Sequence, residues 1–267
     1  MVKGLYTAYT GMVNEQKRMD VMTNNLANSA TTGYKKEAMI AQAFDERLAI
    51  KIKDTSSWHN APEGIGYISL GAKVGETYTN WDQGAFQITD KDSDVALAGR
   101  GFFAIEFTNK AGETSIKYTR DGAFVVDRDG YLRTVDGDYV LTQEGAMNSQ
   151  GGEDNYVQID PNLKYVIATD GSIRQNGEEV TTIGVIDIDN YDYINKYGEN
   201  LYDLIPGGNI VESEAVVQQG MLEASNVNVI DEMVSMITIA RAYEAGQKMI
   251  QAEDSTLEKT ANQIGRV

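Results

Sequence analysis

The sequence contains no cysteine and a single histidine, and both scarcities exclude whole classes of site. Without cysteine, neither disulfides nor a thiolate metal centre can hold the fold. One histidine, His59, excludes zinc sites built from several histidines and makes any histidine-based catalytic triad depend on that residue. His59 lies in a polar, turn-rich stretch, which favours an exposed loop residue.

Long apolar runs are also missing, and the N-terminus lacks the basic start and apolar core of a signal peptide. We therefore expect no membrane insertion, and any export would leave the N-terminus uncleaved. The net charge of −17 lies in the middle of the chain, where residues 54–220 carry eleven basic against twenty-eight acidic residues. Such an acidic surface repels nucleic acid, which we exclude as a partner.

A helix is predicted over residues 5–26, because apolar residues recur there at heptad spacing. The row consists of Leu5, Ala8, Met12, Glu15, Met19, Met22 and Leu26. Tyr6, Tyr9 and Val13 fall on other faces, so a single partner helix would not cover the apolar surface. Three asparagines and the stretch 29–33 then end the helix, either as a simple polar turn or as a junction where side-chain amides clamp a neighbour.

A second, longer helix is predicted from Val229 onwards. Residues 225–228 offer N-cap side chains, and Asp231 and Glu232 suit the positive end of the helix dipole. Its heptad row consists of Val229, Met233, Met236, Ala240, Tyr243, Gln247, Ile250, Asp254, Leu257, Ala261 and Ile264. The length of this row indicates coiled-coil or assembly packing.

Between the helices the hydrophobic period changes to two, from Gly71 to about Asp189. Candidate strands are 101–107, 115–119, 123–126, 131–135, 139–142, 156–159, 164–168 and 180–188. Glycine-containing steps at 129–130, 137–138 and 176–177 predict hairpin turns. Residues 34–53 fit a short helix or a strand equally well, and the composition from Thr55 to about Gly66 is typical of a loop.

These patterns predict an α+β fold in which long N- and C-terminal helices form a coiled-coil-like pair around an inserted all-β domain. The β domain should be an antiparallel sandwich or barrel-like structure. We expect a terminal helical domain (1–30 plus 224–267), a connecting region (31–70 plus 206–223) and an all-β outer domain (71–205). Copies of the same chain are the simplest partners for the remaining apolar surface.

The sequence predicts no catalytic residue, metal or cofactor. The stretch 127–130 matches part of a calcium loop but lacks the later acidic ligands, and its Asp-Gly step suits a hairpin turn. Gly99-Arg100-Gly101 precedes a β pattern and not a helix, so it does not predict a phosphate loop. No Gly-x-Ser-x-Gly nucleophile motif is present.

Several motifs resemble those of the bacterial flagellar rod, hook and hook-associated protein family. They are Gly4-Leu5-Tyr6-Thr7-Ala8, the stretches 24–36, 99–103 and 118–124, Leu222-Glu223-Ala224-Ser225-Asn226-Val227-Asn228-Val229, and the stretches 232–234 and 241–244. The resemblance implies a structural, non-enzymatic subunit of the flagellar basal-body rod, proximal or distal. It also implies export by the flagellar type III apparatus and assembly with copies of itself and neighbouring rod and hook proteins.

The residues expected at the assembly interface come from both helices and their junctions. They are Leu5, Met12, Met19, Met22, Asn24, Asn25, Leu26, Asn28, Ser225, Asn226, Asn228, Met233, Met236, Ile237, Arg241, Tyr243, Ile250 and Leu257. The alternatives are a secreted surface or adhesive β protein with an oligomerising helical stalk and, less favoured, an enzyme such as a wall-acting glycosidase. The adhesive alternative does not explain why both chain ends carry heptad rows.

Overall fold

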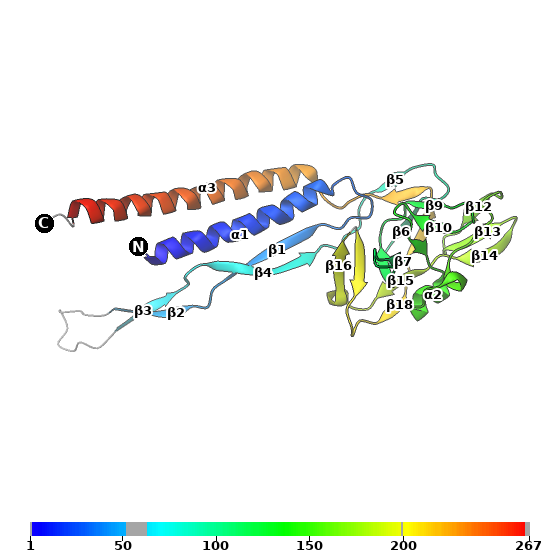
Figure 1. The fold of residues 1–267 in the computed structure, drawn as a ribbon, viewed down its shortest axis with the longest axis horizontal. Helices are drawn as coiled ribbons and strands as arrows, with labels where there is room; N and C mark the ends of the chain where they lie inside the picture. The colour runs from blue at the N-terminus through cyan, green and yellow to red at the C-terminus, as the bar shows by residue number, and fades with distance from the viewer. Residues whose placement is uncertain (1, 52–62, 199, 265–267) are drawn as a thin grey trace. The chain divides into compact units, whose positions relative to one another are not determined.

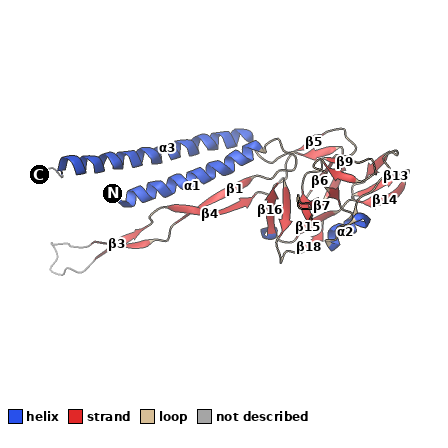
Figure 2. Cartoon of the chain, in the orientation of Figure 1, coloured by secondary structure: helices blue, strands red, loops and turns tan. Residues whose placement is uncertain are grey.

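A computed structural model describes residues 2–51, 63–198 and 200–264, so the region around His59 lies outside the described residues. The chain divides into two compact units. Unit 1 comprises Met1–Ala27, Lys36–Asn80 and Asn228–Val267, and unit 2 comprises Asn28–Lys35 and Trp81–Val227. The predicted α+β class is confirmed, with an N-terminal helix, a β-rich middle and a C-terminal helix (Figure 2).

Unit 1 contains the two long helices, α1 (Val2–Ala27) and α3 (Val229–Lys259), the latter continuing in a short π-helical segment to Ile264. The helices lie side by side and run antiparallel (Figure 1). Asn228 caps α3, because its side-chain oxygen accepts a 3.1 Å hydrogen bond from the Ile230 amide, which confirms the predicted start. Among the described residues, no helix is apolar over a length that would cross a membrane.

Unit 1 also contains a ribbon of antiparallel strand pairs. β1 (Glu37–Ala43) pairs with β4 (Ala72–Thr79), and β2 (Arg47–Lys51) pairs with β3 (Glu63–Ile68). The stretch that fitted a helix or a strand therefore forms strands. Its strand partners lie further along the chain, and a local pattern cannot reveal them. α1 packs against both β1 and β4.

Unit 2 is built from short strands with one short α-helix, α2 (Gln143–Asn148). Its strands are β5 (Phe86–Ile88), β6 (Val95–Ala98), β7 (Phe102–Thr108), β8 (Thr114–Thr119), β9 (Phe124–Val126), β10 (Leu132–Thr134), β11 (Tyr139–Val140), β12 (Tyr165–Ile167), β13 (Ser172–Gln175), β14 (Glu178–Thr182), β15 (Val185–Ile188), β16 (Ile194–Gly198), β17 (Leu201–Leu204), β18 (Ile210–Glu212), β19 (Val216–Gln219) and β20 (Met221–Glu223). The largest sheet has the order β16-β17-β8-β7-β11-β10-β9, with β15 pairing both β7 and β18. Smaller sheets are β12-β13-β14, β19-β6 and β20-β5.

Most of the predicted strands are present, with two differences. Residues 156–159 form only isolated bridges, and 180–188 divides into β14 and β15 at Ile183-Gly184. The predicted turn glycines Gly130, Gly137 and Gly177 all have positive φ, as their hairpins require.

Buried apolar side chains are concentrated in unit 2. Two clusters form its core, one around Phe103, Ile105 and Phe124 and the other around Phe102 and Tyr202. Among the described residues of unit 1, Ile239 is the single apolar side chain that is fully buried. Unit 1 is therefore held mainly by half-buried side chains and polar contacts.

Candidate functional site

One face of α1 packs against α3 at close range. A Cβ added at Gly246 would lie 2.7 Å from Met12 Cγ, and one at Gly4 would collide with the Glu253 carboxylate. The absence of a side chain at both glycines lets the helices approach. The remaining apolar members of the predicted α1 row are half-buried; they are Leu5, Ala8, Met19, Met22 and Leu26.

A second face of α1 lies on the strand ribbon. The Thr7 hydroxyl donates a 3.2 Å hydrogen bond to the Leu70 carbonyl, and Thr10 lies directly against Gly71. The half-buried or buried residues of this face include Arg18, Val21 and Asn25. The ribbon thus covers a second face of α1 but leaves Tyr6, Tyr9 and Val13 exposed.

At the end of this face, Asn25 forms a buried junction with β1 and α3. Its side chain is 0% exposed, donates a 2.8 Å hydrogen bond to the Glu37 carbonyl and accepts a 2.9 Å bond from the Glu37 amide. The Asn25 amide nitrogen also lies 3.5 Å from the buried Glu232 carboxylate, which forms an ion pair with Lys36. Of the two sequence-based interpretations, the amide clamp describes Asn25, and the partners seen here belong to the same chain.

The inward face of α3 contains some residues of the predicted row and some of their immediate neighbours. Its buried and half-buried members are Glu232, Ser235, Met236, Ile239, Ala240, Tyr243, Gly246, Ile250 and Glu253. Glu232 is drawn inward by its partners Lys36 and Asn25, and Gly246 sits at the closest approach to α1. Met233, one residue after Glu232, is consequently exposed.

Both helices also present apolar side chains that the described residues of unit 1 leave exposed. On α1 these are Tyr6, Tyr9 and Val13; on α3 they include Ile230, Met233, Val234 and Ile237. Spacings of three and four residues place each set on one helix face. Each set is therefore available for contact with another molecule.

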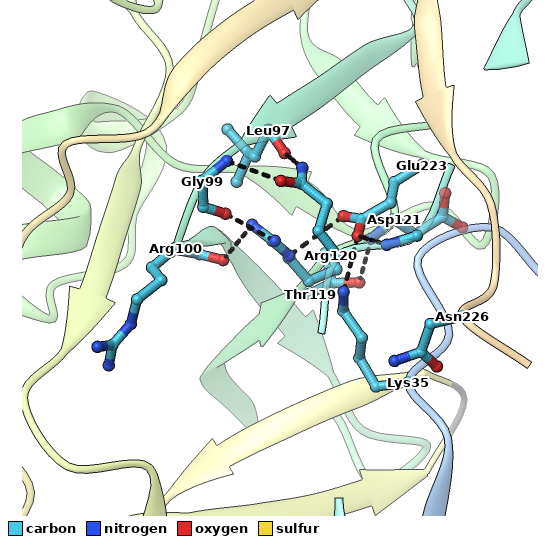
Figure 3. A network of polar contacts seen from close by, with 12 residues as sticks. Lys35, Leu97, Gly99, Arg100, Thr119, Arg120, Asp121, Glu223 and Asn226 are labelled. Carbon is cyan, nitrogen blue, oxygen red and sulfur yellow. Dashed lines mark hydrogen bonds and ion pairs between the residues drawn. The ribbon is translucent and has the colours of Figure 1, made fainter. Parts of the chain in front are cut away.

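In unit 2, a buried ionic network joins the two chain segments that lead to the helices (Figure 3). Glu223 accepts a 2.7 Å hydrogen bond from Lys35 Nζ, and its other oxygen lies 3.2 Å from Arg120 Nε. All three side chains are at least 95% buried. The Arg120 guanidinium also donates to the carbonyls of Gly99 and Gly101, at 2.8 and 2.9 Å.

The four motifs at 24–36, 99–103, 118–124 and 222–229 each supply a member of this network. Gly33 fits there because its φ is 66° and an added Cβ would lie 2.5 Å from the Asp121 amide nitrogen. Its amide donates a 2.7 Å hydrogen bond to the Glu223 carbonyl. The network therefore fixes where segment 28–35 and strand β20 join the β body.

Burial changes the ionisation of two groups in this region. Desolvation lowers the pKa of Lys35, although the neighbouring Glu223 carboxylate opposes the change. Desolvation also raises the pKa of Asp121, even though its carboxylate accepts hydrogen bonds from the Thr32 hydroxyl and the Ala123 amide. The region is therefore arranged for structural ion pairing at a cost in desolvation.

The predicted interface residues are distributed over both units. Asn25 is buried, and Asn24, Asn228, Met233, Ile237, Arg241 and Leu257 are exposed. The half-buried ones are Leu5, Met12, Met19, Met22, Leu26, Asn28, Ser225, Asn226, Met236, Tyr243 and Ile250. Asn28, Ser225 and Asn226 belong to unit 2, where the Asn226 amide donates a 3.0 Å bond to the Asp82 carbonyl.

The sequence did not reveal the charged residues of either junction. Lys35, Arg120 and Glu223 are separated by long stretches of sequence, as are Lys36 and Glu232, so no local spacing signals their pairing. The sequence of α3 has apolar residues on more than one helix face. What the sequence could not show is which row faces inward.

The described residues contain no cluster of three metal-ligating side chains. The partial calcium motif at 127–130 is the turn between β9 and β10, in which the Gly130 amide donates to the Asp127 carbonyl. The Asp127 carboxylate lies 3.1 Å from Arg133. That acid is therefore occupied by an ion pair in the fold.

Family models match three parts of the chain. The flagella basal body rod protein model matches residues 5–35, the flagellar hook protein FlgE/F/G D1 domain matches 96–178, and the flagellar basal body rod FlgEFG protein C-terminal model matches 218–264. The flagellar basal-body rod protein FlgG of Buchnera aphidicola is 31% identical over 97% of this chain and 98% of its own. The chain belongs to the flagellar basal-body rod protein family.

Other relatives of this rod-family chain carry different names. FlgF of Caulobacter vibrioides is 32% identical over 100% of this chain and 98% of its own, and the hook-basal body complex protein FlhO of Bacillus subtilis is 28% identical over the full length of both. Proteins of this family are structural and not enzymatic. Membership of the family places the chain in the flagellar basal body. The adhesive-protein and glycosidase alternatives are set aside on this ground.

Proposed function

We propose that this chain is a rod subunit that assembles with copies of itself and with neighbouring rod and hook proteins through unit 1. The observation that supports this proposal is the scarcity of fully buried apolar side chains among the described residues of unit 1. At the same time, α1 and α3 each carry a row of exposed apolar side chains. Fully burying one such side chain contributes about 1.5–3 kcal/mol. Several of them covered by a neighbour would offset the entropy of fixing the helices in a polymer.

The finer features of the prediction belong to this proposal. In the polymer, α1 and α3 form a coiled-coil-like pair, and the β domain has a sandwich-like or barrel-like architecture. The division into residues 1–30 plus 224–267, 31–70 plus 206–223 and 71–205 remains a prediction, although the compact units group 36–80 with the helices. Relatives named FlgG, FlgF and FlhO have similar identities, so they do not favour one position in the rod.

Electron microscopy of the purified, concentrated chain tests self-assembly. We expect rod-like polymers from the wild type and from the control Gln251→Asp, which changes an exposed polar residue of α3. Met236→Asp, which puts a charge on the inward face of α3, should prevent polymers while leaving the unfolding of the β body unchanged. Polymers formed equally well by Met236→Asp would contradict assembly through the helices.

Export is proposed through the flagellar type III apparatus without cleavage of the N-terminus. The test is to express the chain in its own bacterium with and without a functional export apparatus and to compare the material outside the cytoplasm. We expect the intact N-terminus in isolated basal bodies of the first strain and retention inside the second. Delivery in the absence of the apparatus would refute this route.

A further inference from the structure

The exposed apolar residues of unit 1 form two separate patches. The N-patch consists of Tyr6, Tyr9 and Val13 on α1, and the first two are 60% and 57% exposed. The C-patch consists of Ile230, Met233, Val234 and Ile237 on α3, with Ile230 72% exposed. The two patches do not contact each other, because they lie at different levels, that is, at different positions along the axis of the antiparallel helix pair.

Three contacts fix those levels. Gly4 lies against Glu253, Met12 against Gly246 and Asn25 near Glu232. The N-patch is therefore level with the C-terminal half of α3, and the C-patch is level with the last two turns of α1. The patches are offset by about 14 residues, or about 20 Å at 1.5 Å rise per residue.

We propose that the N-patch of one copy packs on the C-patch of the next copy, so that contacts propagate head to tail. This inference rests on the proposed function and names the surfaces and the direction of assembly. Two different surfaces at different levels of one helix pair make a heterologous contact. Because each contact also shifts the next copy along the helix direction, the contacts extend an open chain and do not close into a ring. Successive copies would be displaced by about 20 Å along the helix direction.

Charge favours this pairing over contact between two identical C-patches. α1 carries three basic and two acidic residues, a net charge of +1, whereas α3 carries three basic and six acidic residues, a net charge of −3. Packing α1 of one copy on α3 of another brings opposite net charges together. Packing α3 on α3 would bring two acidic helices together.

The absence of cysteine allows a direct test by introduced thiols. Full-length Tyr9→Cys, Val234→Cys and the double variant are treated with a short bismaleimide under assembly conditions. We expect a ladder of covalent oligomers from the double variant, a dimer from the two single variants mixed, and monomer from each single variant alone. Lys110→Cys, at an exposed position of unit 2, combined with Val234→Cys measures the background of random collision.

The outcomes separate this inference from the proposed function. Dimers of Val234→Cys alone would overturn it in favour of a symmetric C-patch interface. Rod-like polymers seen by electron microscopy without a ladder in the double variant would also overturn it, while self-assembly itself would stand. A failure of the wild-type chain to polymerise, together with no ladder, would refute both.

Discussion

Replacing Asn25 by aspartate tests the buried junction of unit 1 most directly. Aspartate retains the oxygen that accepts from the Glu37 amide, but it loses the donor to the Glu37 carbonyl. Leaving a buried carbonyl without its partner costs about 1–3 kcal/mol. The new carboxylate would also take the place of an amide nitrogen 3.5 Å from Glu232 Oε2, inside a site with no exposed surface at Asn25.

The electrostatic part of the destabilisation by Asn25→Asp has an upper limit. Two like charges 4 Å apart repel by about 4 kcal/mol at an effective dielectric constant of about 20. Protonation of the introduced acid limits this penalty, so we expect a total loss of about 3–5 kcal/mol in the free energy of unfolding at neutral pH. Because the introduced acid would have a raised pKa in the folded state, the loss should shrink as the pH falls towards the ordinary carboxyl range.

Asn24→Asp is the matched control, since Asn24 is exposed and adjacent. Both variants add a negative charge at the unfavourable C-terminal end of α1. The difference between their free energies of unfolding therefore reports the effect of burial at Asn25. The assay is denaturant unfolding of the full-length chain followed by far-ultraviolet circular dichroism. Combining Asn25→Asp with Glu232→Gln should cost less than the sum of the single changes, by about 1 kcal/mol or more. Equal stability of Asn25→Asp and Asn24→Asp would refute the buried junction.

Three further outcomes are expected. Glu223→Gln should destabilise unit 2 by about 3–5 kcal/mol, because Lys35 and Arg120 would stay buried but lose their counter-charge. A loss below about 1 kcal/mol in the free energy of unfolding, measured by chemical denaturation, would contradict the network. Asp121→Asn should leave unit 2 at least as stable as the wild type at neutral pH, because the raised pKa of Asp121 means that its ionised carboxylate is disfavoured in the fold. This advantage should disappear at acidic pH, where Asp121 is protonated. A lower melting temperature of the variant at neutral pH would count against this reasoning. Limited proteolysis of the dilute monomer should remove the terminal helices first and leave a core near residues 81–227, whereas termini that survive as long as the core would show that unit 1 is stable alone.

The sequence predicted the features that depend on local pattern. The start of α3 followed from capping residues around Asn228, and the hairpin at Asn176-Gly177 followed from a dipeptide that accepts positive φ. The ribbon of β1 and β4 was not predicted, because its pairing joins Glu37 to Thr79. Nor was the buried position of Glu232, whose ion-pair partner Lys36 lies far away in the sequence.

In the candidate site, too, local pattern predicted some features, and long-range contacts determined the others. The motifs identified the regions that meet in the Glu223 network, but composition could not show that Lys35, Arg120 and Glu223 share one buried position. Heptad spacing predicted the two long helices. It could not distinguish an inward residue such as Glu232 from its exposed neighbour Met233, because both follow a three-and-four spacing.

The division of unit 1 among three separated segments has a consequence for the order of folding. α1 is synthesised first, but its partner α3 is completed only after residues 28–228 have been made. The faces of α1 that contact α3 therefore stay uncovered throughout synthesis, and long-range closure of this kind is slow compared with hairpin formation. A chain built this way completes its helical unit last, after the β body has been synthesised.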